Sequence, residues 1–342
     1  MNIFLTGNNG YIGSVLEKKI MELGFNVTGY DTNYFKDCYL TKTENNKKQI
    51  FRDIRQISLN DLAGIDAVIH LAGLSNDPLG EFHPEITNQI NYLSTKKLAN
   101  LSKEAGVKRF VYASTQSMYG ISGSDQELDE DLSEKNPITS YAKTKLLSEE
   151  YLKSIANDDF IVTSFRPSTV FGPSPRFRSD IVFNSLVCCA YTTGTVEILS
   201  DGSPWRPVIH IEDVCSAFIA GLIAPPYLVN RKAFNVGIDN GNYTVKDLAE
   251  AAVRAVPGAK LKFLNKHTDP RSYKVSFTKI LNELKDFYKP KWNLLDGGKE
   301  LVNFFKEVNM KENIFRGSKT NRIIRLKELV NQKKIDKNFY WK

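Results

Sequence analysis

The stretch that decides the fold is Thr6-Gly7-Asn8-Asn9-Gly10-Tyr11-Ile12-Gly13, which directly follows a short apolar run. Gly7 allows a tight turn, Gly10 lets backbone N–H groups approach a pyrophosphate, and Gly13 permits close packing of a helix against a strand. The next residues repeat apolar side chains at helical spacing, so a helix over 11–23 would point its unpaired N–H groups at the anion. We therefore predict cofactor contacts from Gly7, Asn9, Gly10, Tyr11 and Ile12.

An acidic residue follows this turn at the spacing of a dinucleotide site. Glycine patterns also occur in turns that bind nothing, so the argument depends on Asp31, which ends the apolar run 26–30. Its carboxylate accepts hydrogen bonds from both hydroxyls of an adenosine ribose and repels a 2′-phosphate. Arg and Lys are absent within four residues of Asp31. These features predict NAD, rather than NADP, as the cofactor.

Apolar β-rich segments alternate with amphipathic ones through the first half of the chain. The expected strands cover residues 3–6, 26–30, 67–71, 109–114 and 160–165, and the expected helices cover 11–23, 84–105 and 138–156. Parallel strands joined this way need a helix at each crossover. The fold class is therefore predicted to be α/β, with a Rossmann-type doubly wound parallel sheet.

The second half is interrupted by Gly and Pro, at Gly172-Pro173-Ser174-Pro175 and again over 202–207. This change predicts a second, smaller mixed α/β domain beside the first. The expected boundaries are an NAD-binding Rossmann domain over 1–170, with returning segments near 206–238 that add strands around Val208 and Phe234; a substrate-binding domain over 171–205 and 239–310; and a basic helical tail over 311–342.

Composition excludes several classes of protein. The 342 residues are 42% hydrophobic and 11% aromatic, enough to bury a large core, so a disordered or fibrous chain is not expected. Apolar stretches are far shorter than the ~20 residues of a membrane-spanning helix, and no signal-peptide pattern opens the chain. Four cysteines without a CxxC spacing and four histidines predict neither a metal site nor a disulfide framework. We expect a soluble, cytoplasmic protein without a membrane partner.

The net charge of +7 is concentrated at one end. Residues 311–342 hold ten basic and three acidic side chains, and the rest of the chain is balanced. An apolar stripe at helical spacing runs through this tail: Ile323, Ile324, Leu326, Leu329 and Val330. The tail is thus expected to be a solvated amphipathic helix, with an anion-contacting segment as the alternative. If the tail bound nucleic acid, that binding would weaken steeply with added salt and would be lost when the tail is deleted. We expect no nucleic-acid partner.

A tyrosine and a lysine have the spacing of a catalytic pair. Tyr141 and Lys145 are four residues apart in the predicted helix 138–156, so they share one face. A nearby ammonium would lower the tyrosine pKa from its usual ~10 and make the phenolate a proton acceptor. Thr115, after the strand 109–114, would bind the same substrate oxygen. Thr115, Tyr141 and Lys145 are the predicted catalytic residues.

With these residues the chain resembles the extended short-chain dehydrogenase/reductase family, in its branch of NAD-dependent nucleotide-sugar epimerases and dehydratases. The resemblance covers about residues 1–310 and also rests on the motifs His70-Leu71-Ala72-Gly73 and Ser114-Thr115. It implies cofactor contacts from Asp53, Ile54, Leu71, Ala72, Gly73, Ser114, Tyr141, Lys145, Pro167 and Ser168. Asn91 is left open between a role in holding the sheet and a contact with the active site.

The resemblance also implies how the substrate binds. Arg206 matches a diphosphate-binding arginine, Arg271 is a second candidate, and Thr169 borders the substrate. Planar guanidinium groups suit a diphosphate because they donate bidentately to its oxygens. Two departures alter the pattern: Thr169 stands where many members have Asn, and Ser276 replaces an expected Asp.

The residues after Thr115 decide between reactions. The 4,6-dehydratases of this branch carry an Asp-Glu pair there, and the decarboxylases carry a Glu, whereas this chain has Gln116 and Ser117. Neither side chain can act as a carboxylate acid or base, so dehydration is disfavoured. The remaining reactions are epimerisation of a nucleoside-diphosphate sugar through transient oxidation of a hydroxyl at C4, and the action of a nucleotide-sugar dehydrogenase or ketoreductase. The selection of NAD favours the epimerase.

Two further expectations follow. A dinucleotide-sensing protein without catalysis is a remote alternative, because such proteins typically lack the Tyr or the Lys. The helices 84–105 and 138–156 resemble the pair that forms a four-helix dimer interface in this family, so a homodimer is expected.

Overall fold

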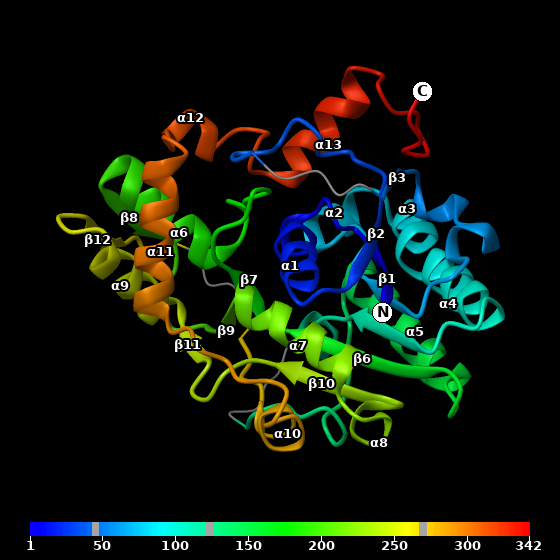
Figure 1. The fold of residues 1–342 in the computed structure, drawn as a ribbon. Coiled ribbons are helices and arrows are strands. Elements are labelled where there is room, and N and C mark those ends of the chain that lie inside the picture. The colour runs from blue at the N-terminus through cyan, green and yellow to red at the C-terminus, as the bar shows by residue number, and fades with distance from the viewer. Residues whose placement is uncertain (43–47, 121–125, 267–271) are drawn as a thin grey trace.

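The computed structural model describes residues 1–42, 48–120, 126–266 and 272–342. At its centre lies a seven-stranded parallel sheet (Figure 1). In spatial order its strands are β10 (Lys232–Val236), β6 (Ile161–Pro167), β5 (Arg109–Ala113), β4 (Ala67–His70), β1 (Asn2–Thr6), β2 (Asn26–Asp31) and β3 (Gln49–Phe51). The strand order reverses between β1 and β4, which opens a crevice outside their carboxyl ends. The predicted doubly wound α/β fold is confirmed.

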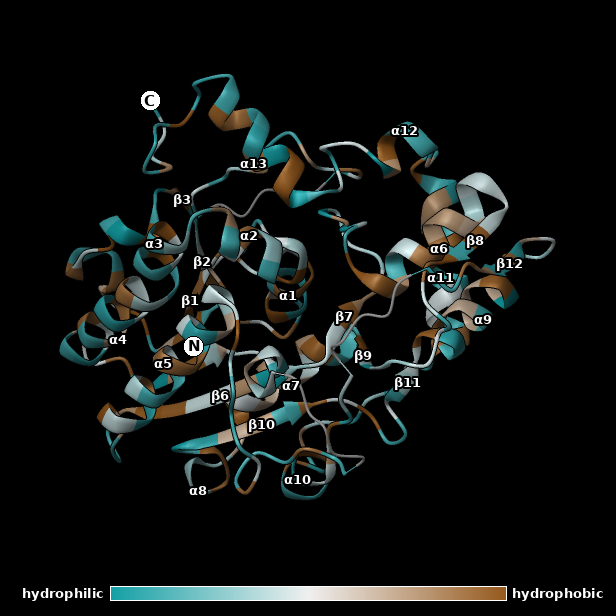
Figure 2. Cartoon of the chain, turned by 180° about the vertical axis from the view of Figure 1, so that it is seen from behind, coloured by the Kyte–Doolittle hydropathy of each residue, from teal (hydrophilic) through white to brown (hydrophobic). Residues whose placement is uncertain are grey.

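The inner strands β1, β4, β5 and β6 are buried on both faces, as is usual for a parallel sheet. Successive residues of β1 serve opposite faces: Ile3 and Leu5 belong to one hydrophobic core and Phe4 to the other. Helices α1 (Tyr11–Glu22) and α7 (Ile211–Ile223) pack on the first face, and α5 (Ser140–Ile155) contributes to the second core. Figure 2 shows the apolar colour on the strands and on the inner sides of these helices.

The remaining helices are short or lie in the second half. They are α2 (Asp77–Phe82), α3 (Pro84–Thr87), α4 (Ser94–Glu104), α6 (Val182–Thr193), α8 (Pro226–Val229), α9 (Val245–Ala255), α10 (Thr278–Glu283), α11 (Leu294–Glu307), α12 (Glu312–Phe315) and α13 (Arg322–Asn331), with 3₁₀ turns η1 (Ile54–Gln56), η2 (Leu59–Leu62) and η4 (Gln116–Tyr119). Each helix in the described ranges is too short or too polar to cross a lipid bilayer.

The helix expected over 84–105 is divided. Between α3 and α4 the chain forms a π-helical turn, η3 (Asn88–Leu93). Such turns insert an extra residue and often occur at functional sites. Here the turn carries Asn91, whose side chain reaches the loop after β4: it accepts from Leu74 N (2.8 Å) and donates to Leu74 O (3.1 Å). The role of Asn91 is therefore to hold that loop.

The second half forms a smaller body beside the large sheet (Figure 1). Its strands are β7 (Thr169–Phe171), β9 (Trp205–His210) and β11 (Asn242–Thr244) in one sheet, and β8 (Thr195–Ile198) and β12 (Lys260–Phe263) in another. Helices α6, α9 and α11 share a core with the first of these sheets. The expectation that the strand around Val208 joins the large sheet is wrong: β9 pairs with β7 and β11, and only β10, around Phe234, joins it.

The last residues are packed, not solvated. Leu326 and Leu329 of α13 are fully buried and belong to the same core as Phe4, together with Ile335 and Phe339. Two of the basic side chains, Arg322 and Arg325, are also buried. The predicted apolar stripe is correct, but the helix uses it to dock on the Rossmann fold, so the expectation of a solvated tail is wrong.

Candidate functional site

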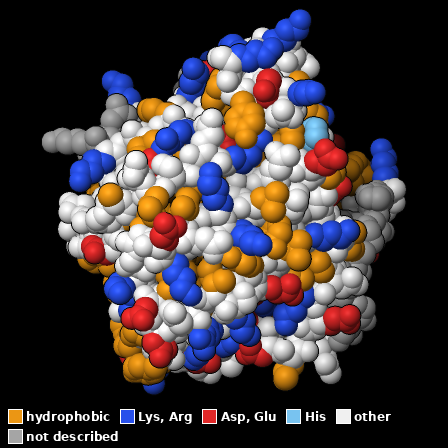
Figure 3. Space-filling view, turned by 90° about the vertical axis from the view of Figure 1, so that its right-hand side faces the viewer, with side chains coloured by type: hydrophobic (Ala, Val, Ile, Leu, Met, Phe, Trp, Pro, Cys, Tyr) orange, Lys and Arg blue, Asp and Glu red, His pale blue; other side chains and the backbone are white. Residues whose placement is uncertain are grey.

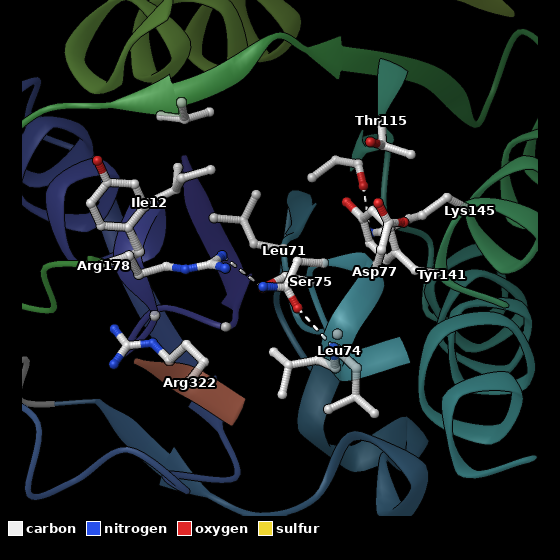
Figure 4. A pocket seen from close by; sticks show the side chains of 18 of the residues that line it. Ile12, Leu71, Leu74, Ser75, Asp77, Thr115, Tyr141, Lys145, Arg178 and Arg322 are labelled. Carbon is white, nitrogen blue, oxygen red and sulfur yellow. Dashed lines mark hydrogen bonds between the residues drawn. The ribbon is translucent and has the colours of Figure 1, made fainter. Parts of the chain in front are cut away.

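A pocket of about 610 Å³ lies at the carboxyl ends of the central strands. It extends from the glycine turn and the end of β2 to the ends of β5 and β6. Residues from later in the chain complete its walls: Arg178 and residues 180–182, Arg206, Tyr273, and residues 321–323. The pocket thus occupies the crevice where ligands bind in doubly wound folds (Figure 4).

Almost every predicted site residue lines this one pocket. These are Gly7, Gly10, Tyr11, Ile12, Asp31, Asp53, Ile54, Leu71, Ala72, Gly73, Ser114, Thr115, Tyr141, Lys145, Pro167, Ser168, Thr169 and Arg206. Asn9 lies behind the lining, where its backbone N–H donates to Asp31. Arg271 lies outside the described residues.

The glycine turn is shaped by close contacts. Gly7 has φ +73°, and a Cβ on Gly13 would lie 2.1 Å from the carbonyl oxygen of Gly7. Gly10, the residue before α1, carries no side chain that could cap the helix. The first N–H groups of α1 therefore remain available to an anion in the pocket.

The carboxylate of Asp31 is held by two backbone N–H groups. Oδ1 accepts from Asn33 (2.6 Å) and Oδ2 from Asn9 (3.2 Å). Burial raises the pKa of Asp31, and the charges of Arg176 and Arg322 act in the opposite direction. The sequence near Asp31 holds no cation, so these arginines reach it only through the fold. Each carboxylate oxygen keeps a lone pair for a ribose hydroxyl.

Asp53 forms an ion pair with Arg55. Its carboxylate accepts from Arg55 Nε (2.9 Å) and Nη2 (2.7 Å), and it caps η1 through the Arg55 backbone N–H (2.8 Å). The guanidinium of Arg55 in turn stacks on Tyr340, with 3.7 Å from its carbon to the ring centre. The part of the pocket lined by Asp53 is therefore linked through Arg55 to the end of the chain.

Thr115 presents a hydroxyl hydrogen to the pocket. Its Oγ accepts from the backbone N–H of Ser117 (3.1 Å), which fixes the side chain at the start of η4. The hydroxyl can then donate toward Tyr141, and this interaction lowers the pKa of the phenol. Both side chains project toward one region of the pocket in Figure 4.

Tyr141 is a buried phenol. Burial raises its pKa to about 12, while the hydrogen bond with Thr115 and the charge of Arg178 lower it. Lys145 is also buried: its Nζ donates to Ala113 O (2.6 Å), and desolvation lowers its pKa to about 7. Arg178 is thus a cation that lowers the pKa of Tyr141, and the same effect expected of Lys145 stays a prediction.

Arg178 and Asp180 are pocket residues that the sequence analysis missed. Their side chains form a two-point ion pair, with Nε–Oδ1 3.0 Å and Nη2–Oδ2 2.7 Å, and Arg178 also donates to Ser75 (3.2 Å; Figure 4). Asp180 accepts from Asn76 (2.9 Å). An Arg and an Asp two positions apart in a Gly/Pro-rich segment resemble a solvated pair, so the sequence offered no distinguishing signal.

Several buried polar atoms of the pocket residues lack a hydrogen-bond partner within the described part of the chain. Gln116 donates to Arg166 O (3.0 Å) and Ser168 Oγ (3.2 Å), but its Oε1 has no hydrogen-bond partner in the described ranges. Ser114 Oγ and Arg322 Nη1 also lack one there. Buried polar groups are costly when unpaired. A dinucleotide, with its phosphates, riboses and amide, fits this set of donors and acceptors.

Two of the residues predicted to bind the substrate lie on strands of the second body. Thr169 begins β7, and Arg206 lies on β9 with its Nη1 donating to Trp205 O (2.7 Å). Clusters of three His, Cys, Asp or Glu side chains that could hold a metal ion do not occur among the described residues.

Comparison with known proteins identifies the family of this chain. The model of the NAD dependent epimerase/dehydratase family matches residues 3–237. A UDP-glucuronate 4-epimerase of Thermodesulfobacterium geofontis is 29% identical over 323 residues, covering 89% of this chain and 95% of the relative. An uncharacterized UDP-glucose epimerase of Bacillus subtilis, YtcB, is 30% identical over 254 residues, covering 69% and 77%.

A solved structure shares the fold. The UDP-glucuronic acid 4-epimerase from Bacillus cereus in complex with NAD is 25% identical and superimposes with a TM-score of 0.75, covering 90% of this chain and 97% of that one. The likeness therefore extends well beyond the sheet.

Proposed function

The chain belongs to the NAD dependent epimerase/dehydratase family, and on that premise we propose that it epimerises a nucleoside-diphosphate sugar at C4. As a member of this family it is an enzyme that uses NAD. The observation that carries the finer proposal is the composition of the catalytic end of the pocket. Tyr141, Thr115 and Lys145 supply groups for oxidation of a hydroxyl, whereas Gln116 supplies no carboxylate for a subsequent elimination.

The structure of Gln116 supports the same choice. Its amide N–H₂ is turned to the sheet, toward Arg166 O and Ser168, so it has no proton to exchange with a sugar carbon. The carboxylate of Asp77 accepts from Thr139 Oγ (2.7 Å), and its charge raises the pKa of Tyr141. Removal of a proton from the sugar hydroxyl therefore falls to Tyr141.

The mechanism follows from the environment of the phenol. When bound, NAD supplies the acceptor for a hydride from the sugar carbon. Thr115 donates to the reacting sugar oxygen and orients it toward Tyr141. Tyr141 takes the hydroxyl proton, and the charge of Arg178 offsets part of the cost of a buried phenolate. Lys145, held at Ala113 O, is placed to donate to a ribose hydroxyl.

The substrate diphosphate is assigned to the second body. Arg206 and Thr169 border the pocket beyond Thr115, and the intervening volume suits a sugar between the diphosphate and Tyr141. Because Thr169 begins β7 and Arg206 lies on β9, the proposed substrate-binding domain includes these two strands besides residues 171–205 and 239–310. The proposed NAD-binding domain is then the large sheet of residues 1–167 with β10, together with α7. The names of the relatives support a UDP-sugar as the first substrate to test.

The protein acts as a homodimer through α4 and α5. Leu93, at the start of α4, and Leu147, on α5, are large apolar side chains left 48% and 43% exposed. The face on this side of the molecule carries apolar side chains among scattered Lys and Arg (Figure 3). An isologous pairing would cover both leucines. Light scattering should give twice 38.7 kDa for the native protein and the monomer mass for Leu147→Glu, with unchanged secondary structure.

The enzyme works in a reducing compartment, the cytoplasm. All four cysteines carry free thiols, and three of them are buried. Proteins of oxidising compartments tend to pair such residues.

The reaction is tested by proton NMR of purified protein with UDP-glucuronate or UDP-glucose and a catalytic amount of NAD. Appearance of the C4 epimer to equilibrium, without net change in NADH absorbance, is the expected result. A requirement for stoichiometric NAD or NADH would instead assign a dehydrogenase or ketoreductase. Loss of water or of carbon dioxide from the sugar would contradict the inference that Gln116 rules out dehydration and decarboxylation.

A further inference from the structure

The C-terminal segment, residues 318–342, lies across the adenosine end of the pocket. Near its end, Trp341 Nε1 donates to Thr32 O (2.6 Å), and the Tyr34 hydroxyl donates to Phe339 O. Near its beginning, residues 321–323 line the pocket. The segment therefore forms a wall over β2 and the residues that follow it, as Figure 1 shows for α13 and the chain end.

This wall carries a buried cation with a spare donor. Arg322 is 3% exposed, and its Nη2 donates to Arg176 O (2.5 Å). Its Nη1 has no hydrogen-bond partner in the described ranges. Burial lowers the pKa of Arg322 to about 10, which still leaves the guanidinium charged at neutral pH. A buried, charged donor without a partner costs free energy unless a ligand satisfies it.

The carboxylates around Arg322 are already engaged. Asp180 holds Arg178 through two bonds, and Asp31 holds two backbone N–H groups. Cys38 is a buried thiol whose pKa is raised. Arg176, the other arginine near Asp31, is fully buried and stacked on Tyr39, 3.4 Å from its ring centre. The group that Nη1 awaits is therefore an additional anion.

Contacts give the position of Arg322 along the pocket. It donates to Arg176 O, and the Arg176 side chain donates to Asn33 Oδ1 (3.3 Å), whose backbone N–H holds Asp31. On its other side lies Arg178, which lines the same pocket and donates to Ser75. We therefore place Arg322 between the carboxylate expected to hold the adenosine ribose and the catalytic end. A dinucleotide bound from Asp31 to Tyr141 must place its diphosphate in this interval. Figure 4 shows the Arg322 side chain within the pocket, beside Arg178.

We propose that Arg322 binds the diphosphate of NAD, so that the C-terminal segment is an integral part of the cofactor site. Its guanidinium acts from the side of the pocket opposite the glycine turn and complements the N–H groups of α1. Arg176 is a positioning residue, because its carbonyl fixes Arg322. The inference depends on the NAD dependence of the family and not on the C4 epimerase assignment, and it is tested by binding alone.

The test measures ligand affinity calorimetrically on full-length protein freed of nucleotide. The ligands are NAD, ADP-ribose and NADP, with adenosine measured by displacement of NAD. Arg322→Ala should weaken NAD and ADP-ribose together by roughly 10- to 100-fold, the loss of a charged hydrogen bond, and should leave adenosine within about twofold. Arg322→Lys should recover part of the lost affinity, because lysine keeps the positive charge but lacks the planar guanidinium that donates two hydrogen bonds.

Two further variants separate binding from folding. Arg325→Ala lies one turn along α13, where Arg325 pairs with exposed Asp37 (2.5 Å), outside the pocket, and should leave all affinities unchanged. Arg322→Met removes the charge but fills the space, so its unfolding temperature without nucleotide should not fall, whereas its stabilisation by NAD should. Parallel loss of adenosine and NAD binding, or weakening of NADP alone, would overturn the proposal: the first indicates a structural role and the second a 2′-phosphate site.

Discussion

The two ends of the pocket are built in different ways. At the catalytic end, Thr115, Tyr141 and Lys145 come from β5 and α5, which are neighbours in the large sheet and its covering helices. At the adenosine end, Asp31 on β2 is enclosed by Arg322 and Trp341 from the last residues of the chain. The catalytic end is thus a product of one supersecondary unit, whereas the adenosine end depends on long-range docking.

Because of this difference, we expect the turnover rate and the affinity for NAD to depend on different ends of the pocket. Substitutions at the catalytic end should change the rate while NAD remains bound. Substitutions at the adenosine end, or in the helix that closes it, should change stability or affinity while the rate at saturating NAD is kept. Four predictions test this division, in order of decreasing effect.

The largest effect is expected at the phenol. Tyr141→Phe should lower turnover by about 10²- to 10⁴-fold, the scale of general acid–base catalysis, because the proton acceptor is lost. NAD affinity, measured by calorimetry, should stay within about twofold of native, since the ring still fills its buried place. Tyr151→Phe, on the same helix but outside the pocket, is the matched control. Full turnover by Tyr141→Phe would remove the basis of the mechanism.

Docking of the C-terminal helix should contribute strongly to stability. Leu326→Ala creates a cavity in the core shared with Phe4 and should lower the free energy of unfolding by roughly 2–5 kcal/mol. Ile324→Ala, on the exposed side of the same helix, should cost about 0.5 kcal/mol or less. Chemical denaturation measures both. Equal, small effects would mean that the segment is dispensable for the adenosine end.

The carboxylate at the end of β2 should govern affinity. Asp31→Ala should weaken NAD binding by about 1–3 kcal/mol, the cost of lost hydrogen bonds to a charged group. Turnover at saturating NAD should be kept, unlike that of Tyr141→Phe. Asp158→Ala, an exposed carboxylate on the surface, serves as the control. Tighter binding of NADP than of NAD by the native protein would contradict the role given to Asp31.

The last effect, the smallest when counted per pH unit, is a pH dependence at the catalytic end. Burial lowers the pKa of Lys145 to about 7 from its usual 10.5, so between these values the unfolded chain binds a proton that the folded protein does not. The free energy of unfolding should therefore rise with pH in that window, by at most about 1.4 kcal/mol per pH unit, and this contribution is lost as pH falls through 7. Lys145→Met should flatten that rise in pH-dependent denaturation. An identical slope in both proteins would show that Lys145 stays charged.

Much of the catalytic end was predictable because its signals are local. The glycine spacing at Gly7 to Gly13, the four-residue separation of Tyr141 and Lys145, and Thr115 at a strand end each follow from the geometry of one turn or one helix. The π-helical turn at Asn91 was not predictable, since its extra residue is stabilised by contacts with the loop after β4.

The sequence by itself determined the doubly wound fold, the glycine turn after β1 and the set of side chains proposed to be catalytic, because periodicity and short spacings express local backbone geometry. It also contained the apolar stripe of α13. Only the tertiary structure decided that this stripe docks on the Rossmann core and carries Arg322 to Asp31, and that Arg178 reaches Tyr141. Such placements depend on which apolar surfaces are buried together across more than a hundred residues, and a solvated arginine and a site arginine look alike until that burial is known.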